Sequence, residues 1–177
     1  MIAVLLAAGC DDDSFLGGKW VPTQLTAGDG GGARAFGAFL GRCPTGDTSE
    51  ACELFVDFSL GHYGDDVVGV VRYYENESRQ REVVCAPDDD VFCSCMSIRG
   101  KYNEPKFDFQ ITDCHGLERN AQMVRKTSDQ VELVIFDAPS ADCPGKPDCT
   151  TLRFDLEKTL NEDQLTPRDI ACTACQL

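Results

Sequence analysis

The sequence predicts an all-β fold, an antiparallel meander that closes as a small up-and-down barrel and ends in a short helix. The first indication is alternation in segments rich in aromatic and β-branched residues, such as 106–113, where Phe107, Phe109 and Ile111 face one way. The second is that short turn-forming stretches separate neighbouring strand candidates, which favours hairpins over crossovers. A meander of this length hides its edges by closing into a barrel or folding into a β-sandwich, which is the alternative.

The strand candidates follow one another along most of the chain, each bounded by turn-forming residues. They are segments 19–25, 35–40, 54–60, 67–74, 81–86, 91–99, 106–113, 121–126, 130–136 and 150–158. A helix of at most two turns is expected near the C-terminus, because Thr166 suits the N-cap, Pro167 the first helical position and Asp169 the first turn.

Composition places the chain among compact, exported domains. It has 177 residues, enough for one domain, with eleven cysteines and a formal net charge of −14. That many thiols argue against a cytosolic enzyme, and the acidic balance argues against nucleic-acid binding. The sequence contains no run of eighteen apolar residues, which a membrane-spanning helix would need.

The chain begins with an apolar run that ends in Ala7, Ala8, Gly9 and Cys10, and three aspartates follow it. This pattern resembles the end of a bacterial lipoprotein signal peptide, in which the cysteine is lipidated and cleavage falls just before it. The resemblance implies lipid attachment at Cys10 and a bacterial envelope location facing the periplasm or the cell surface. It divides the chain into a signal-peptide remnant (1–9), an acidic tether (10–17) and a β domain (18–177). The alternative is that 2–8 form an ordinary buried strand and that Cys10 is a disulfide partner.

A second resemblance rests on Gly18-Lys19-Trp20 at the start of the first strand candidate. This motif is similar to the start of the lipocalins and related calycins, eight-stranded barrels with one open end that often holds an apolar ligand. The resemblance implies that Trp20 closes the bottom of the barrel and packs against Arg153, which lies in the last strand candidate.

Removing Cys10 from the eleven cysteines leaves ten, an even set that suits disulfides. These ten are Cys43, Cys52, Cys85, Cys93, Cys95, Cys114, Cys143, Cys149, Cys172 and Cys175. Short spacings favour local pairs, and the expected pairs are Cys43–Cys52, Cys85–Cys93, Cys95–Cys114, Cys143–Cys149 and Cys172–Cys175. Two alternatives keep thiols free: a redox motif at Cys172-Thr173-Ala174-Cys175, and a zinc site built from Cys93, Cys95, Cys114 and His115. An exported chain with an even cysteine set favours the disulfides, so no metal or other cofactor is predicted.

No catalytic motif stands out. The histidines, His62 and His115, fall in turn-like segments, and no Gly-x-Ser-x-Gly elbow accompanies them. We therefore expect a non-catalytic binding or scaffolding protein of the envelope, with a carrier of a small apolar ligand as the alternative and an enzyme or thiol redox protein as less favoured. Its expected partners are the membrane, through Cys10, and an unknown protein or small apolar ligand, but no nucleic acid.

Overall fold

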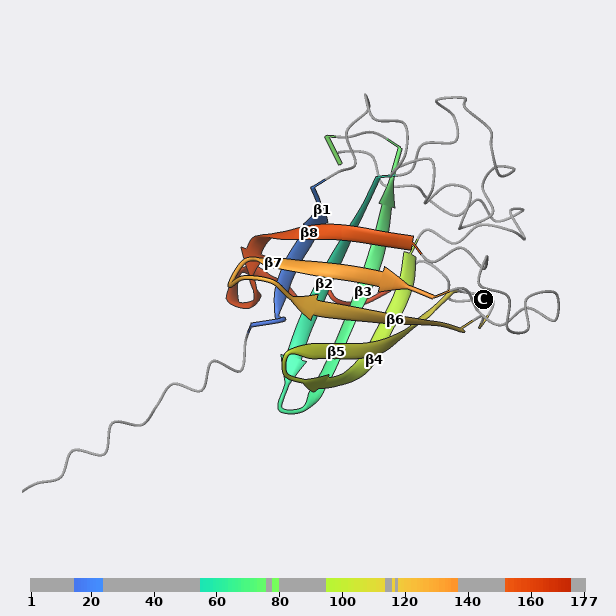
Figure 1. The fold of residues 1–177 in the computed structure, drawn as a ribbon. Coiled ribbons are helices and arrows are strands. Elements are labelled where there is room, and N and C mark those ends of the chain that lie inside the picture. The colour runs from blue at the N-terminus through green and yellow to red at the C-terminus, as the bar shows by residue number, and fades with distance from the viewer. Residues whose placement is uncertain are drawn as a thin grey trace, which may run out of the picture.

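The computed structural model is a closed barrel of eight antiparallel strands (Figure 1). It describes residues 15–23, 55–75, 78–79, 95–113, 116, 118–136 and 152–172. The strands are β1 (Gly18–Pro22), β2 (Phe55–Tyr63), β3 (Asp66–Tyr74), β4 (Cys95–Asn103), β5 (Lys106–Thr112), β6 (Glu118–Arg125), β7 (Gln130–Ile135) and β8 (Leu152–Asn161). Each strand pairs with the next along the chain, and β8 pairs with β1. The predicted barrel is confirmed and the sandwich is wrong, whereas candidates 35–40 and 81–86 lie outside the described residues.

Alternation along each strand separates an apolar inner face from a more polar outer face. Directly opposed residues share a face, so Trp20, Phe58, Val71 and Met96 form one inward row across β1 to β4. On β5 the predicted alternation is confirmed, since Phe107, Phe109 and Ile111 are buried. This inner face is the hydrophobic core of the barrel.

The two ends of the barrel are built differently. The tight hairpins β2–β3, β4–β5 and β6–β7 lie at one end, which we call the closed end. The connections β1–β2, β3–β4, β5–β6 and β7–β8 all leave from the opposite end, because strand direction alternates around the barrel. Phe15 and Leu16 are buried next to the start of β1, so residues 15–17, at the end of the predicted tether, pack against the barrel.

Gly18 is required where β1 meets β8. Its φ of +132° is rarely adopted by other residues, and a Cβ there would lie 2.3 Å from the Leu160 carbonyl oxygen. The glycine of the Gly18-Lys19-Trp20 motif therefore allows the first and last strands to approach closely enough to close the barrel.

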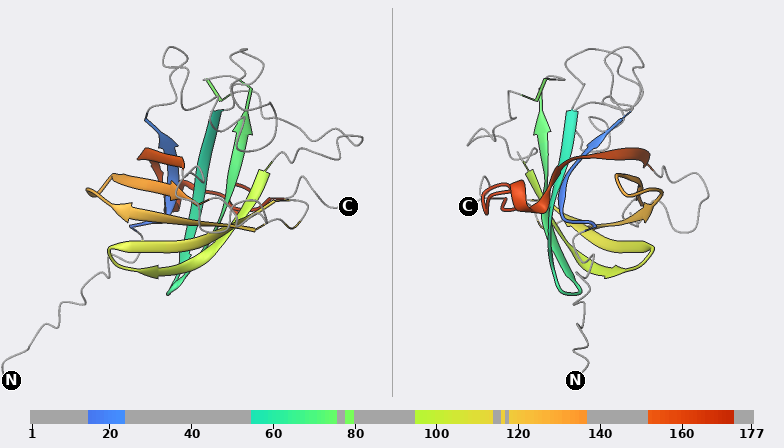
Figure 2. Two further views of the ribbon diagram at one scale, coloured as in Figure 1. Left: turned by 45° about the vertical axis from the view of Figure 1, so that its right-hand side comes forward. Right: turned by 90° about the vertical axis from the view of Figure 1, so that its left-hand side faces the viewer.

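The helix predicted from Thr166 is wrong. The only helical element among the described residues is a 3-10 turn, η2 (Glu162–Gln164). The start signal is nevertheless used, because the Asp169 side chain accepts hydrogen bonds from the Thr166 amide and hydroxyl, both at 2.7 Å, within a single turn. The chain does not continue as a helix through 172, and Cys172 is bonded to Cys95 on β4. Figure 2 shows this part of the chain on the outer side of β2 and β3.

This turn predicts a pH-dependent contribution to stability. The hydrogen bonds from Thr166 hold the pKa of the Asp169 carboxyl below its ordinary value. A pKa depressed in the folded state adds stability above the unfolded value, about 3.9, and that stability is lost as the pH falls through the folded value. Asp169→Asn should thus lower the free energy of unfolding by about 1 kcal/mol at pH 7 and by much less below about pH 3. Urea unfolding at both pH values measures this, and an equal loss at both would contradict it.

Candidate functional site

Trp20 seals the closed end from inside. Its side chain is fully buried, its indole N–H donates to the Leu16 carbonyl at 2.8 Å, and the Phe15 ring meets it edge-on at 5.7 Å. Lys158 Nζ lies 5.0 Å from the centre of the indole and donates to the Gly17 carbonyl at 3.0 Å. The N-terminal residues 15–17 are therefore held across the closed end by a cation and two aromatic rings.

Arg153 does not contact Trp20, so the predicted pair is wrong. Its side chain is 62% exposed on the outer wall of β8, 3.7 Å from Glu132 of β7. Side chains alternate along a strand, and Arg153 lies an odd number of residues from Lys158, so the two point to opposite faces. The buried residues Phe154 and Leu156 share the face of Lys158, so alternation along the strand is the sequence signal that indicates the lysine.

The described interior of the barrel is filled from the closed end to its middle. Several large inward side chains have no exposed surface, so no water-sized space lies beside them: Trp20, Phe58, Leu60, Val67, Phe107, Val131, Leu133 and Leu156. This part of the interior leaves no room for a ligand.

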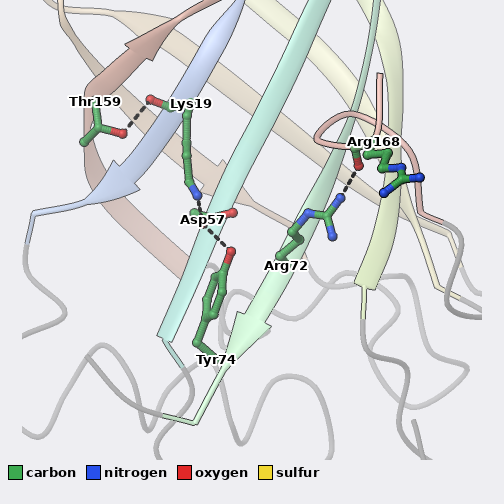
Figure 3. Close-up of polar contacts among 6 residues, drawn as sticks. All are labelled: Lys19, Asp57, Arg72, Tyr74, Thr159 and Arg168. Atoms are coloured by element: carbon green, nitrogen blue, oxygen red, sulfur yellow. Dashed lines mark hydrogen bonds and ion pairs between the residues drawn. The ribbon is translucent and has the colours of Figure 1, made fainter. Parts of the chain in front are cut away.

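A charged cluster lies on the outer face of β1, β2 and β3 (Figure 3). Asp57 is fully buried, with Lys19 Nζ at 2.6 Å from its Oδ2 and the Tyr74 hydroxyl donating to the same oxygen at 2.7 Å. Asp57 Oδ1 is also buried and has no hydrogen-bond partner in the described part of the chain. Thr159 of β8 donates to the Lys19 carbonyl at 3.2 Å, which fixes the strand that carries the lysine.

The cluster lies beside the C-terminal segment, residues 165–172. Arg72 donates to the carbonyls of Arg168 and Ala171, and a Cβ at Gly61 would contact Ile170. The disulfide Cys95–Cys172 then fixes the segment to β4. With no exposed surface, Asp57 is out of reach of a substrate, so the cluster is suited to holding strands together and not to catalysis.

The Cys95–Cys172 disulfide corrects two expected pairs. Cys95–Cys114 and Cys172–Cys175 are wrong, because each needs a sulfur that is already bonded. The same bond removes a thiol from the zinc alternative and from the redox alternative. The two bonded cysteines are 77 residues apart, so local spacing carried no information about them. The remaining predicted cysteines, with Cys10, lie outside the described residues: Cys43, Cys52, Cys85, Cys93, Cys114, Cys143, Cys149 and Cys175.

His62 lies in β2, not in a turn as expected. Its ring meets Tyr102 edge-on at 5.4 Å, and neither ring nitrogen has a hydrogen-bond partner within the described residues. Burial and the negative charge of Glu104 raise the pKa of Tyr102. His115 lies outside the described residues, and the described part contains no cluster of three or more potential metal ligands.

An open groove of about 420 Å³ lies on the outer wall of β4, β5 and β6. Its lining residues are Arg99, Gly100, Asp108, Phe109, Gln110, Asn120, Ala121 and Phe136. Arg99, Asp108, Gln110 and Asn120 are exposed, and Phe136 is 41% exposed, which is unusual for an aromatic ring. The groove thus offers accessible polar groups that the buried Asp57 cluster lacks.

Comparison of the chain with protein-family models, curated proteins and solved structures found no match. Among the described residues, no helix is long and apolar enough to cross a membrane.

The Lys19–Asp57 pair makes a stability prediction. Lys19→Met leaves the Asp57 carboxylate buried without its counter-charge and should lower the free energy of unfolding by about 3 kcal/mol. The double variant Lys19→Met/Asp57→Asn removes that charge while keeping an acceptor for Tyr74, so it should be more stable than Lys19→Met alone. The control is the more exposed ion pair between Arg153 and Glu132. Arg153→Met should lower the free energy of unfolding by less than about 1 kcal/mol. Urea unfolding measures all three, and a double variant less stable than Lys19→Met would contradict the charge argument.

Proposed function

We propose that the protein is a non-catalytic binding or scaffolding module, held at the bacterial envelope by a lipid on Cys10 and facing the periplasm or the cell surface. The observation that carries the proposal is the filled interior: inward side chains from the closed end to the middle of the barrel have no exposed surface. A barrel of this kind is a rigid support, and its outer wall is available for contact with partners.

The position of Cys10 supports an anchored module. Phe15 is already part of the closed end, so only residues 11–14 separate the proposed lipid from the folded barrel. An extended chain spans at most about 3.5 Å per residue, so the closed end would sit within about 20 Å of the lipid. The strand ends opposite the closed end would then point away from the membrane.

The net negative charge of the chain supports a module that faces solvent. Of the charged residues, twelve basic and fifteen acidic ones belong to the described part, a difference of −3. The whole chain has sixteen and thirty, a difference of −14, so −11 belongs to the remaining segments. Such charge favours solubility and basic partners over anionic surfaces.

The anchor is tested on protein extracted from membranes. The intact mass should show cleavage before Cys10 and acylation of that residue, and Cys10→Ser should abolish both. Cys172→Ser is the matched control, because it removes another cysteine and should leave the lipid in place. Residues 1–9 still attached to an unmodified Cys10 would overturn the anchor.

The binding module is separated from the apolar carrier by what accompanies the purified barrel. Native mass spectrometry of the folded chain should show no bound lipid or other small apolar molecule beyond the covalent modification. A stoichiometric apolar ligand that disappears on unfolding would favour the carrier and contradict the proposed binding module.

A further inference from the structure

The groove on the outer wall is built from one row of side chains in register. Arg99 of β4 is paired with Gln110 of β5, and Gln110 is paired with Asn120 of β6. The Phe136 amide donates to the Asn120 carbonyl at 2.9 Å, which places the aromatic residue at the end of the row. These strands lie side by side in Figure 1. At about 4.8 Å between strands, the row is about 14 Å long.

The polar groups of the row are available to a ligand. Within the described part of the chain, the side chains of Arg99, Gln110 and Asn120 have no hydrogen-bond partner. Asp108 accepts from Gln122 at 2.6 Å through one oxygen, which orients its carboxylate at the groove. Gly100, Phe109 and Ala121 also line the groove; the Phe109 and Ala121 side chains are buried, so main chain contributes to its floor.

The chemistry of the groove excludes several ligand classes. All three strands are paired on both sides, so no free edge exists for an added peptide strand. One guanidinium and one carboxylate line the groove, so it has no charge excess for a polyanion. Its exposed lining contains a single large apolar side chain, Phe136, which is too little for an apolar ligand.

We propose that this groove binds a short neutral oligosaccharide, and this rests on the proposed function as a binding module. A sugar ring carries many hydroxyl groups, each both donor and acceptor, which suit the mixed set of guanidinium, amide and carboxylate groups. The face of a pyranose is made of C–H groups, which lie well on the electron-rich face of an aromatic ring such as Phe136. Two to three rings match the row of about 14 Å, and 420 Å³ is ample for them.

The test is a titration of the full-length, disulfide-bonded chain with cellotriose, maltotriose and chitotriose, followed by backbone amide shifts in NMR spectra. At least one trisaccharide should shift amides of β4, β5 and β6 around Arg99, Gln110 and Asn120, with saturation. Phe136→Ala and Arg99→Ala should each weaken binding about tenfold, which corresponds to about 1.4 kcal/mol.

Two matched variants control for general effects. Arg153→Ala removes an outward arginine from β8, and Tyr63→Ala removes an aromatic side chain that is 59% exposed beyond the groove. Both should bind the trisaccharide as the unmodified chain does. No saturable shift with any of the three sugars, or equal weakening by the control variants, would overturn the proposal. That failure would leave the anchor and the filled interior untouched, since those are measured by mass.

Discussion

The structure depends on the pairing of the first strand with the last. β1 is only five residues long, yet it must join β8 on one side and β2 on the other. Gly18 allows β1 to approach Leu160 of β8 closely. The indole of Trp20, the largest side chain of the core, then fills the closed end of the barrel. Phe15, Leu16 and Lys158 then cover the indole. Without this seal, the apolar inner faces of the neighbouring strands would be exposed to water at the closed end.

The outer wall is used in two different ways. Over β2 and β3 it is buried, with a carboxylate neutralised by Lys19 and with a C-terminal segment fixed by Arg72 and by the disulfide to Cys95. Over β4, β5 and β6 it is open and lined by exposed polar side chains and Phe136. One side of the barrel therefore contributes to stability, and the other leaves functional groups accessible.

Sequence patterns predicted the architecture because they are local. Alternation gave the correct face for Phe107, Phe109 and Ile111, and the succession of hairpins implied the order of strands around the barrel. Contacts between distant residues were not predictable in the same way. Cys172 bonds Cys95 because a segment that contacts Gly61 of β2 and Arg72 of β3 brings it to β4. Arg153 was implied by a family resemblance, whereas alternation along β8 turns its side chain outward and places Lys158 opposite Trp20. The groove needs three strands in register and Phe136 beside them, so no single segment of the sequence shows it.

The central claim, a closed barrel end sealed by Trp20, is tested most directly by the fluorescence of that residue, the single tryptophan of the chain. A fully buried indole held against Phe15 and Leu16 should emit at short wavelength and resist quenching by acrylamide. The chain unfolded in guanidinium should emit at long wavelength and be quenched freely. A native protein whose emission and quenching match those of the unfolded chain would contradict the account.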